Sequence, residues 1–166
     1  MLEENNVIAA RIAELLRARG EKIAVADGAT GGLISASLLT VPGALSFYVG
    51  GGVVYSKAAR DALYALGEDT FAGMKSATED YAALQARAIR DNFQADWGIA
   101  ESGAAGSSKH PMGVASGRSC VGIAGPGGIS VTLLTETQSD DRIANMQTFT
   151  RRALEFLEST LAGAEK

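Results

Sequence analysis

Histidine and cysteine are almost absent from this chain of 166 residues. His110 is the only histidine, which argues against most zinc sites and against a Ser-His-Asp triad. Cys120 is the only cysteine, so the chain has no disulfide framework. Its place in an apolar run predicts a buried structural thiol. We therefore expect neither a metal site nor a cofactor.

Long apolar runs and an excess of one charge are also lacking. No apolar stretch reaches about 18 residues, and the first residues lack the basic and apolar segments of a signal peptide. The formal net charge is −4 with both signs interspersed, which gives no electrostatic footprint for nucleic acid or for an anionic membrane. We expect a cytoplasmic protein with one domain over residues 1–166. A small ligand would have to be held by a helix N-terminus or by single cations.

Apolar periodicity and glycine and proline punctuation predict alternating helices and strands. The predicted helices cover 7–19, with Asn6 as N-cap and Gly20 as stop, then 33–40, 56–66 before Gly67, and 78–93 with Thr78 as N-cap. A last helix is predicted to begin at Asp140 or Asp141 and to end near Leu161. The predicted strands cover 23–26, 47–55, 97–101, 119–124 and 129–135, the last two forming a hairpin. Glycines at 50–52 predict a bulge or a close approach in the second strand. Together these elements predict a three-layer α/β/α domain with a mixed sheet.

Two glycine-rich segments that follow strands indicate a site. Ala26-Asp27-Gly28-Ala29-Thr30-Gly31-Gly32 lies between a strand and a helix, so its backbone N–H groups could hold an anion. Ser102-Gly103-Ala104-Ala105-Gly106 reads as a second turn, and ligands of α/β sheets gather at such strand ends. The same glycines could simply turn the chain. A dinucleotide fingerprint fails at Ile34, where a glycine is required, and no P-loop lysine follows the turn.

Four segments in sequence order resemble the CinA C-terminal domain family. They are Ala26 to Gly32, Val41-Pro42-Gly43-Ala44, Gly50-Gly51-Gly52-Val53-Val54-Tyr55-Ser56 and Ser102 to Gly106. The resemblance covers nearly the whole chain and implies an α/β/α domain with its site on these turns, and a homo-oligomer. The family includes nicotinamide-nucleotide amidases, which hydrolyse nicotinamide mononucleotide to nicotinate mononucleotide and ammonia.

The residues that carry catalysis in those amidases are replaced here. The amidases have Ala-Glu-Ser-Cys-Thr-Gly-Gly at the first turn, where the serine is the nucleophile, and Tyr-Ser-Asn-x-x-Lys at the second motif. In this chain Gly28 stands at the serine position and Arg60 at the lysine position, and only Tyr55 matches. Glycine has no side chain to attack a substrate, and arginine stays protonated and cannot act as the base.

Two hypotheses follow, and a decayed pocket without a ligand is a third reading. In the first, an active amidohydrolase uses Tyr55, Lys57 and another hydroxyl, that of Thr30 or Ser56; Lys57 lies three residues before Arg60 and shares its helix face. These side chains could equally be caps, turn hydroxyls and a solvated lysine.

The second hypothesis, which we favour, is a binding protein for a nucleotide or another small anion. It would use the helix start at Thr30, Gly31 and Gly32, the Ser102-Gly103 turn, and Arg60, which can bind a phosphate with two hydrogen bonds. The irregular segment 107–117 could contribute as a binding loop.

Overall fold

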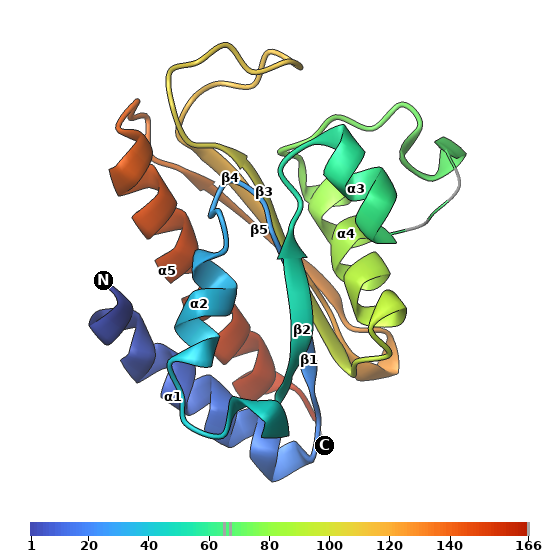
Figure 1. Cartoon of the computed structure of the whole chain (residues 1–166), viewed down its shortest axis with the longest axis vertical. Helices are drawn as coiled ribbons and strands as arrows, with labels where there is room; N and C mark the ends of the chain where they lie inside the picture. Colours follow the sequence, from blue (N-terminus) through green and yellow to red (C-terminus); the bar gives the residue numbers. More distant parts are fainter. Residues whose placement is uncertain (65, 67, 166) are drawn as a thin grey trace.

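A mixed sheet of five strands forms the centre of the computed structural model, which describes residues 1–64, 66 and 68–165 (Figure 1). The strand order is β2-β1-β3-β4-β5. The central strand β1 (Ile23–Asp27) is parallel to β2 (Tyr48–Val53) and to β3 (Trp97–Ala104). The hairpin of β4 (Arg118–Ala124) and β5 (Ser130–Glu136) extends the sheet antiparallel to β3.

Helices cover both faces of this sheet, which confirms the predicted three-layer architecture. One face carries α1 (Leu2–Arg19), α2 (Leu33–Leu39) and α5 (Arg142–Gly163), and the other carries α3 (Lys57–Tyr64) and α4 (Glu79–Asn92) (Figure 1). Three short 3-10 helices, η1 (Ala44–Ser46), η2 (Glu68–Phe71) and η3 (Pro126–Gly128), lie in the connections. Alternate strand residues point to opposite faces, so each face has its own apolar core. No helix in the described residues is long and apolar enough to cross a membrane.

The helices begin or end at the residues predicted as their caps, with one exception. Gly20 ends α1 in the left-handed conformation, Thr78 Oγ1 accepts from Tyr81 N, and Asp141 Oδ1 accepts from Ala144 N at 3.0 Å. The prediction of Asn6 as N-cap was wrong, because α1 already begins at Leu2. Within α1 the Asn6 amide donates to Thr40 Oγ1 at 2.9 Å and ties the helix to the end of α2.

Strand β3 is longer than the sequence indicated. It was expected to end at Glu101 before a glycine turn, but it continues to Ala104 because Ser102 and Gly103 pair with Cys120 and Ser119 of β4. The Ser102-Gly103 segment is therefore sheet rather than a turn. The antiparallel hairpin supplies hydrogen-bond partners that a local pattern does not reveal.

The glycines of β2 confirm the predicted close approach. A Cβ on Gly51 would lie 2.1 Å from the carbonyl oxygen of Val25, so the neighbouring strand leaves no room for a side chain. A Cβ on Gly50 would meet Phe93 at 2.8 Å, and one on Gly52 would meet Leu63 at 2.9 Å. The helical layer thus lies directly against the backbone of β2. The stop predicted at Gly67 falls outside the described residues.

Candidate functional site

A cavity of about 570 Å³ opens at the carboxyl ends of β1, β2 and β3. Its wall is built from the first glycine turn, the start of α3, the segment before α4, the end of β3 and the loop that rises above the sheet after β3 (Figure 1). The lining residues are Gly28, Ala29, Val54 to Lys57, Arg60, Phe71, Ala72, Met74, Ser76, Tyr81, Ser102 to Gly106, Ser108 to Met112 and Arg142. This is the edge at which ligands of open α/β sheets bind.

Most of the residues predicted for the site meet at this cavity. Gly28, Tyr55, Lys57, Arg60 and the Ser102-Gly103 pair all line it. The predicted helix start at Thr30, Gly31 and Gly32 does not belong to the lining, and Thr30 is 0% exposed.

Asp27 occupies the hydrogen-bond donors at the start of α2. Its Oδ1 accepts from Ile34 N at 2.9 Å and from Thr30 Oγ1 at 2.6 Å, and its Oδ2 accepts from Ser35 N at 3.2 Å and Ser35 Oγ at 2.9 Å. A buried carboxylate with several donors takes the place that a ligand anion would need. The expected anion site at this helix start is therefore already filled by the protein.

Glu101 takes another donor of the turn, and sequence reasoning missed it. Its Oε2 accepts from Thr30 N at 3.0 Å, and its Oε1 accepts from Ser119 Oγ at 2.6 Å. Gly31 N is also engaged, donating to Gly28 O at 3.0 Å. Fewer backbone N–H groups of this turn are therefore free to bind a ligand than the sequence led us to expect. The available signal was the alternation in β3, which places Glu101 on the same buried face as Trp97 and Ile99.

Burial sets the electrostatics of this carboxyl group. Glu101 is 1% exposed, and burial raises its pKa from 4.5 to about 7, with the neighbouring Asp27 charge adding to the rise. The hydrogen bonds from Ser119 and Thr30 act in the opposite direction. Neither Asp27 nor Glu101 forms an ion pair within residues 1–64, 66 and 68–165. Two buried carboxyl groups thus share one threonine without a cation.

The backbone at Gly28 has no space for a side chain. A Cβ at this position would lie 2.3 Å from the carbonyl oxygen of Glu101 and 3.1 Å from its Oε2. Even the β-carbon of a serine would overlap the neighbouring strand. The close spacing of β1 and β3 therefore leaves room only for glycine at position 28.

Arg60 is a cation held in place in the part of the cavity wall that α3 forms. It is 8% exposed, and its guanidinium lies 4.3 Å from the centre of the Phe71 ring. Nε and Nη2 donate to Asp61 Oδ1 at 3.1 and 3.0 Å, and Nη1 lies 3.5 Å from Tyr81 Oη. These contacts hold the charge in place but engage part of its donor capacity.

The proposed substitutes for the catalytic residues have other bonds. Lys57 Nζ donates to Asp61 Oδ2 at 2.6 Å, so it is engaged by a carboxylate outside the cavity lining. Ser56 Oγ accepts from Ala59 N at 3.1 Å and caps α3. Ser102 was predicted for ligand binding rather than catalysis, and its Oγ accepts from Ala77 N at 2.9 Å. The Tyr55 side chain lines the cavity, although the residue is 68% exposed.

The loop 107–112 adds cationic and apolar groups to the cavity. Met112 Sδ accepts from Ser76 N at 3.2 Å, which links the loop to the segment before α4. His110 Nδ1 accepts from Met112 N at 3.1 Å, and burial lowers the His110 pKa. Lys109 of this loop and Arg142 at the start of α5 also line the cavity. Within the described residues, no three His, Cys, Asp or Glu side chains gather as a metal site.

The model of the CinA C-terminal domain matches residues 5–161, nearly the whole chain. This chain belongs to the CinA C-terminal domain family. The resemblance seen in its four segments is thereby confirmed.

Curated relatives of this CinA C-terminal domain are longer proteins. A CinA-like protein of Desulforapulum autotrophicum is 33% identical over 147 residues, which are 86% of this chain and 34% of the relative. A CinA-like protein of Prochlorococcus marinus is 30% identical over 158 residues, 95% of this chain and 37% of the relative. The chain therefore spans about a third of the length of these relatives.

Solved structures of CinA superfamily proteins share the whole architecture. One from Klebsiella pneumoniae superposes with a TM-score of 0.87 at 26% identity, covering 96% of this chain and 99% of the other. One from Enterobacter cloacae gives a TM-score of 0.85 at 28% identity, covering 95% and 92%. The order of strands and helices is thus that of the CinA C-terminal domain.

Proposed function

We propose that this CinA C-terminal domain binds a small anionic ligand of the nucleotide class and lacks the Ser-Lys amide hydrolysis of its amidase relatives. The observation that carries the proposal is the charge of the cavity. Its lining includes Lys57, Arg60, Lys109 and Arg142 but no aspartate or glutamate among the described residues. Asp61, outside the lining, is ion-paired with both Lys57 and Arg60. A phosphate or carboxylate would therefore first meet Lys109 and Arg142, which form no ion pair within the described residues.

The uncharged part of the wall supports a ligand with a flat ring. Tyr55, Phe71, Met74 and Met112 contribute aromatic and thioether surface to the same cavity. A mononucleotide carries both a phosphate and a planar base. Nicotinamide mononucleotide, the substrate implied by the family resemblance, has this combination.

The absence of a side chain at position 28 argues against the family mechanism. Gly28 cannot attack a carbonyl carbon, and Arg60 cannot accept the proton of a nucleophile. A reorganised amidohydrolase is the second candidate, favoured by the presence of Tyr55, Ser56 and Lys57 along one wall. In that reading Lys57 would have to leave Asp61 before acting as a base.

Calorimetric titration tests the binding proposal. Nicotinamide mononucleotide and adenosine monophosphate should bind, whereas nicotinamide riboside, which lacks the phosphate, should bind at least about tenfold more weakly. Arg142→Gln should weaken the nucleotides by about 10- to 100-fold, the range expected for a charge-assisted hydrogen bond. Arg152→Gln, on the same helix but outside the cavity, is the matched control and should change nothing. Equal affinity for nucleotide and riboside would contradict the anion site.

Ammonia release from nicotinamide mononucleotide separates the two candidates. The proposal expects no release above the background of a sample without protein. Release by the wild type that disappears in Lys57→Ala or Tyr55→Phe would establish the reorganised amidohydrolase instead. Binding without release supports the proposed function.

A further inference from the structure

The carboxyl group of Glu101 lies directly behind the wall of the cavity. A Cβ on Gly28 would lie 3.1 Å from its Oε2, and a Cβ on Gly103 would lie 2.6 Å from its Oε1. Both glycines line the cavity. The wall in front of the carboxyl group is therefore main chain without side chains. A charged ligand in the cavity acts on Glu101 with only this main chain between them.

Glu101 is buried without a cation to balance its charge. It is 1% exposed, and its hydrogen bonds from Thr30 N and Ser119 Oγ come from neutral groups. Burial raises its pKa to about 7. Near neutral pH, a single negative charge therefore appears or disappears behind the cavity wall.

The elements around Glu101 leave this charge uncompensated among the described residues. Asp27 of β1 adds a like charge and raises the pKa of Glu101 further. Helix α2, which covers this face of the sheet, reads Leu-Ile-Ser-Ala-Ser-Leu-Leu and has no charged residue. Arg118 of β4 forms its ion pair elsewhere, and Arg142 of α5 belongs to the cavity lining. Burial raises the pKa of Cys120 of β4 to about 11, so this thiol stays neutral between pH 7 and 8.5.

We propose that the cavity takes up its anionic ligand together with a proton on Glu101, an inference that rests on the anion binding proposed above. The proton comes from the solvent and converts the Glu101 carboxylate to the neutral acid. A like charge about 7 Å away, in a medium with an effective dielectric constant of about 20, raises the proton affinity of a carboxylate about 10- to 50-fold. By linkage, the ionised carboxylate weakens the ligand by the same factor. The affinity of the site therefore falls as the pH rises above neutrality.

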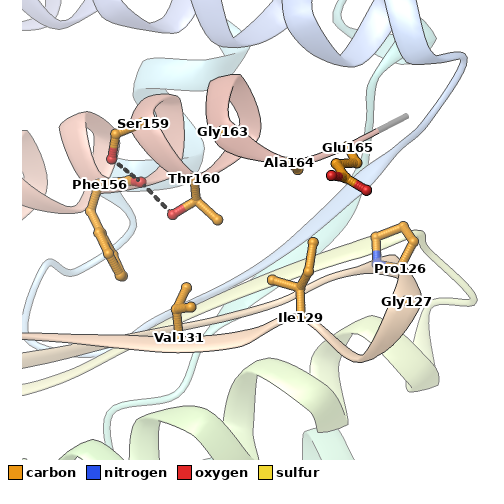
Figure 2. A pocket seen from close by; sticks show the side chains of 10 residues that line it. All are labelled: Pro126, Gly127, Ile129, Val131, Phe156, Ser159, Thr160, Gly163, Ala164 and Glu165. Atoms are coloured by element: carbon orange, nitrogen blue, oxygen red, sulfur yellow. Dashed lines mark hydrogen bonds between the residues drawn. The ribbon is translucent and has the colours of Figure 1, made fainter.

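A second hollow of the molecule does not compete for the anion. It has a volume of about 640 Å³ and lies between β5 and the carboxyl-terminal half of α5, where Val131 and Phe156 face it (Figure 2). Among the described residues its lining contains no lysine or arginine, and Glu165 is its only charged residue. A phosphate or carboxylate finds no cation there. Anion binding measured in solution therefore reports the cavity beside Glu101.

Titration calorimetry of the full chain with nicotinamide mononucleotide tests the pH dependence. From pH 7 to pH 8.5 the dissociation constant of the wild type should rise about 4- to 10-fold, because the pKa of Glu101 is about 7 and the complex holds the proton more tightly. The dissociation constant of Glu101→Gln should stay constant, since glutamine does not ionise. Glu14→Gln is the matched control, because it removes the same charge at an exposed site outside the cavity, and it should behave like the wild type.

Proton uptake is a readout that a merely structural effect of the substitution does not produce. At pH 7.5, binding heats in buffers of different ionisation enthalpy should show about half a proton taken up per ligand by the wild type and none by Glu101→Gln. A phosphate monoester titrates near about pH 6, and burial lowers the His110 pKa, so neither group contributes at this pH. Ser119→Ala removes a donor to the ionised carboxylate and should move the loss of affinity to higher pH.

The outcomes separate this proposal from the proposed function. Binding by the wild type with constant affinity, or with a pH dependence and proton uptake that persist in Glu101→Gln, would overturn the proton coupling alone. Absence of binding at pH 7 would overturn both proposals. Should Glu101→Gln fail to fold, Ser119→Ala still decides, because an unchanged pH dependence in that variant would also overturn the coupling.

Discussion

Replacing Glu101 by glutamine should change how stability depends on pH. The folded state raises the pKa of this carboxyl group from 4.5 to about 7, so the folded state binds the proton more tightly than the unfolded chain does. Below pH 4.5 the group is protonated in both states and contributes nothing. As pH rises from 4.5 to 7 the folded state loses stability, and above 7 the full cost is present.

The size of this effect follows from the shift. A change of 2.5 pKa units, from 4.5 to about 7, corresponds to about 3 kcal/mol, since one unit is about 1.4 kcal/mol. Glu101→Gln removes the ionisable group but keeps polar atoms near Ser119 and Thr30. The free energy of unfolding of the variant relative to the wild type should therefore rise by about 3 kcal/mol between pH 4.5 and pH 8. For a chain of this length that is about 6 to 12 °C in melting temperature.

Urea unfolding followed by tryptophan fluorescence measures the difference. Trp97 is the only tryptophan and is fully buried, so its emission reports loss of the core. The exposed Glu14 provides the control, and Glu14→Gln should track the wild type at every pH from 5 to 8. A constant difference between Glu101→Gln and wild type from pH 4.5 to 8 would refute the reasoning, as would a loss of stability of the variant as pH rises.

Three further predictions concern the interior. Gly28→Ala should destabilise the fold by about 1–3 kcal/mol in urea because its Cβ meets a strand carbonyl, whereas Gly163→Ala, which meets nothing within 4 Å, should be nearly neutral. Asp27→Ala should cost about 3 kcal/mol because several donors lose a buried acceptor, against about 1 kcal/mol for the exposed cap Asp141→Ala; equal losses would show that Asp27 is not the anchor of α2. Burial raises the Cys120 pKa to about 11, so at pH 8 its thiol should react with a disulfide reagent only after unfolding.

Short-range sequence patterns were sufficient to predict most helices and strands of the fold. Gly20, Thr78 and Asp141 marked helix ends because caps act within one turn of the chain. The glycine turn before the β5 strand marked the hairpin for the same reason.

Two of the features missed at the site depend on contacts between distant segments. Ser102 was assigned to a turn because its pairing with Cys120 is invisible locally. The donors of Thr30 were expected to be free, but Glu101, 71 residues away, occupies one of them. The sequence identified part of the cavity lining, including Gly28, Tyr55 and Arg60, but not the wall formed by Phe71, Met74 and Tyr81. The tertiary fold also decided which polar groups of the predicted residues are still available.

The tight contact at Gly28 also limits which side chains can be introduced at this position. A single exchange to serine would place the new β-carbon 2.3 Å from the carbonyl oxygen of Glu101. The variant would therefore gain a hydroxyl and lose stability at the same time. Design of an amidase from this scaffold should therefore begin by widening the gap between β1 and β3. The gap between the two strands would have to be widened before a serine is introduced at position 28.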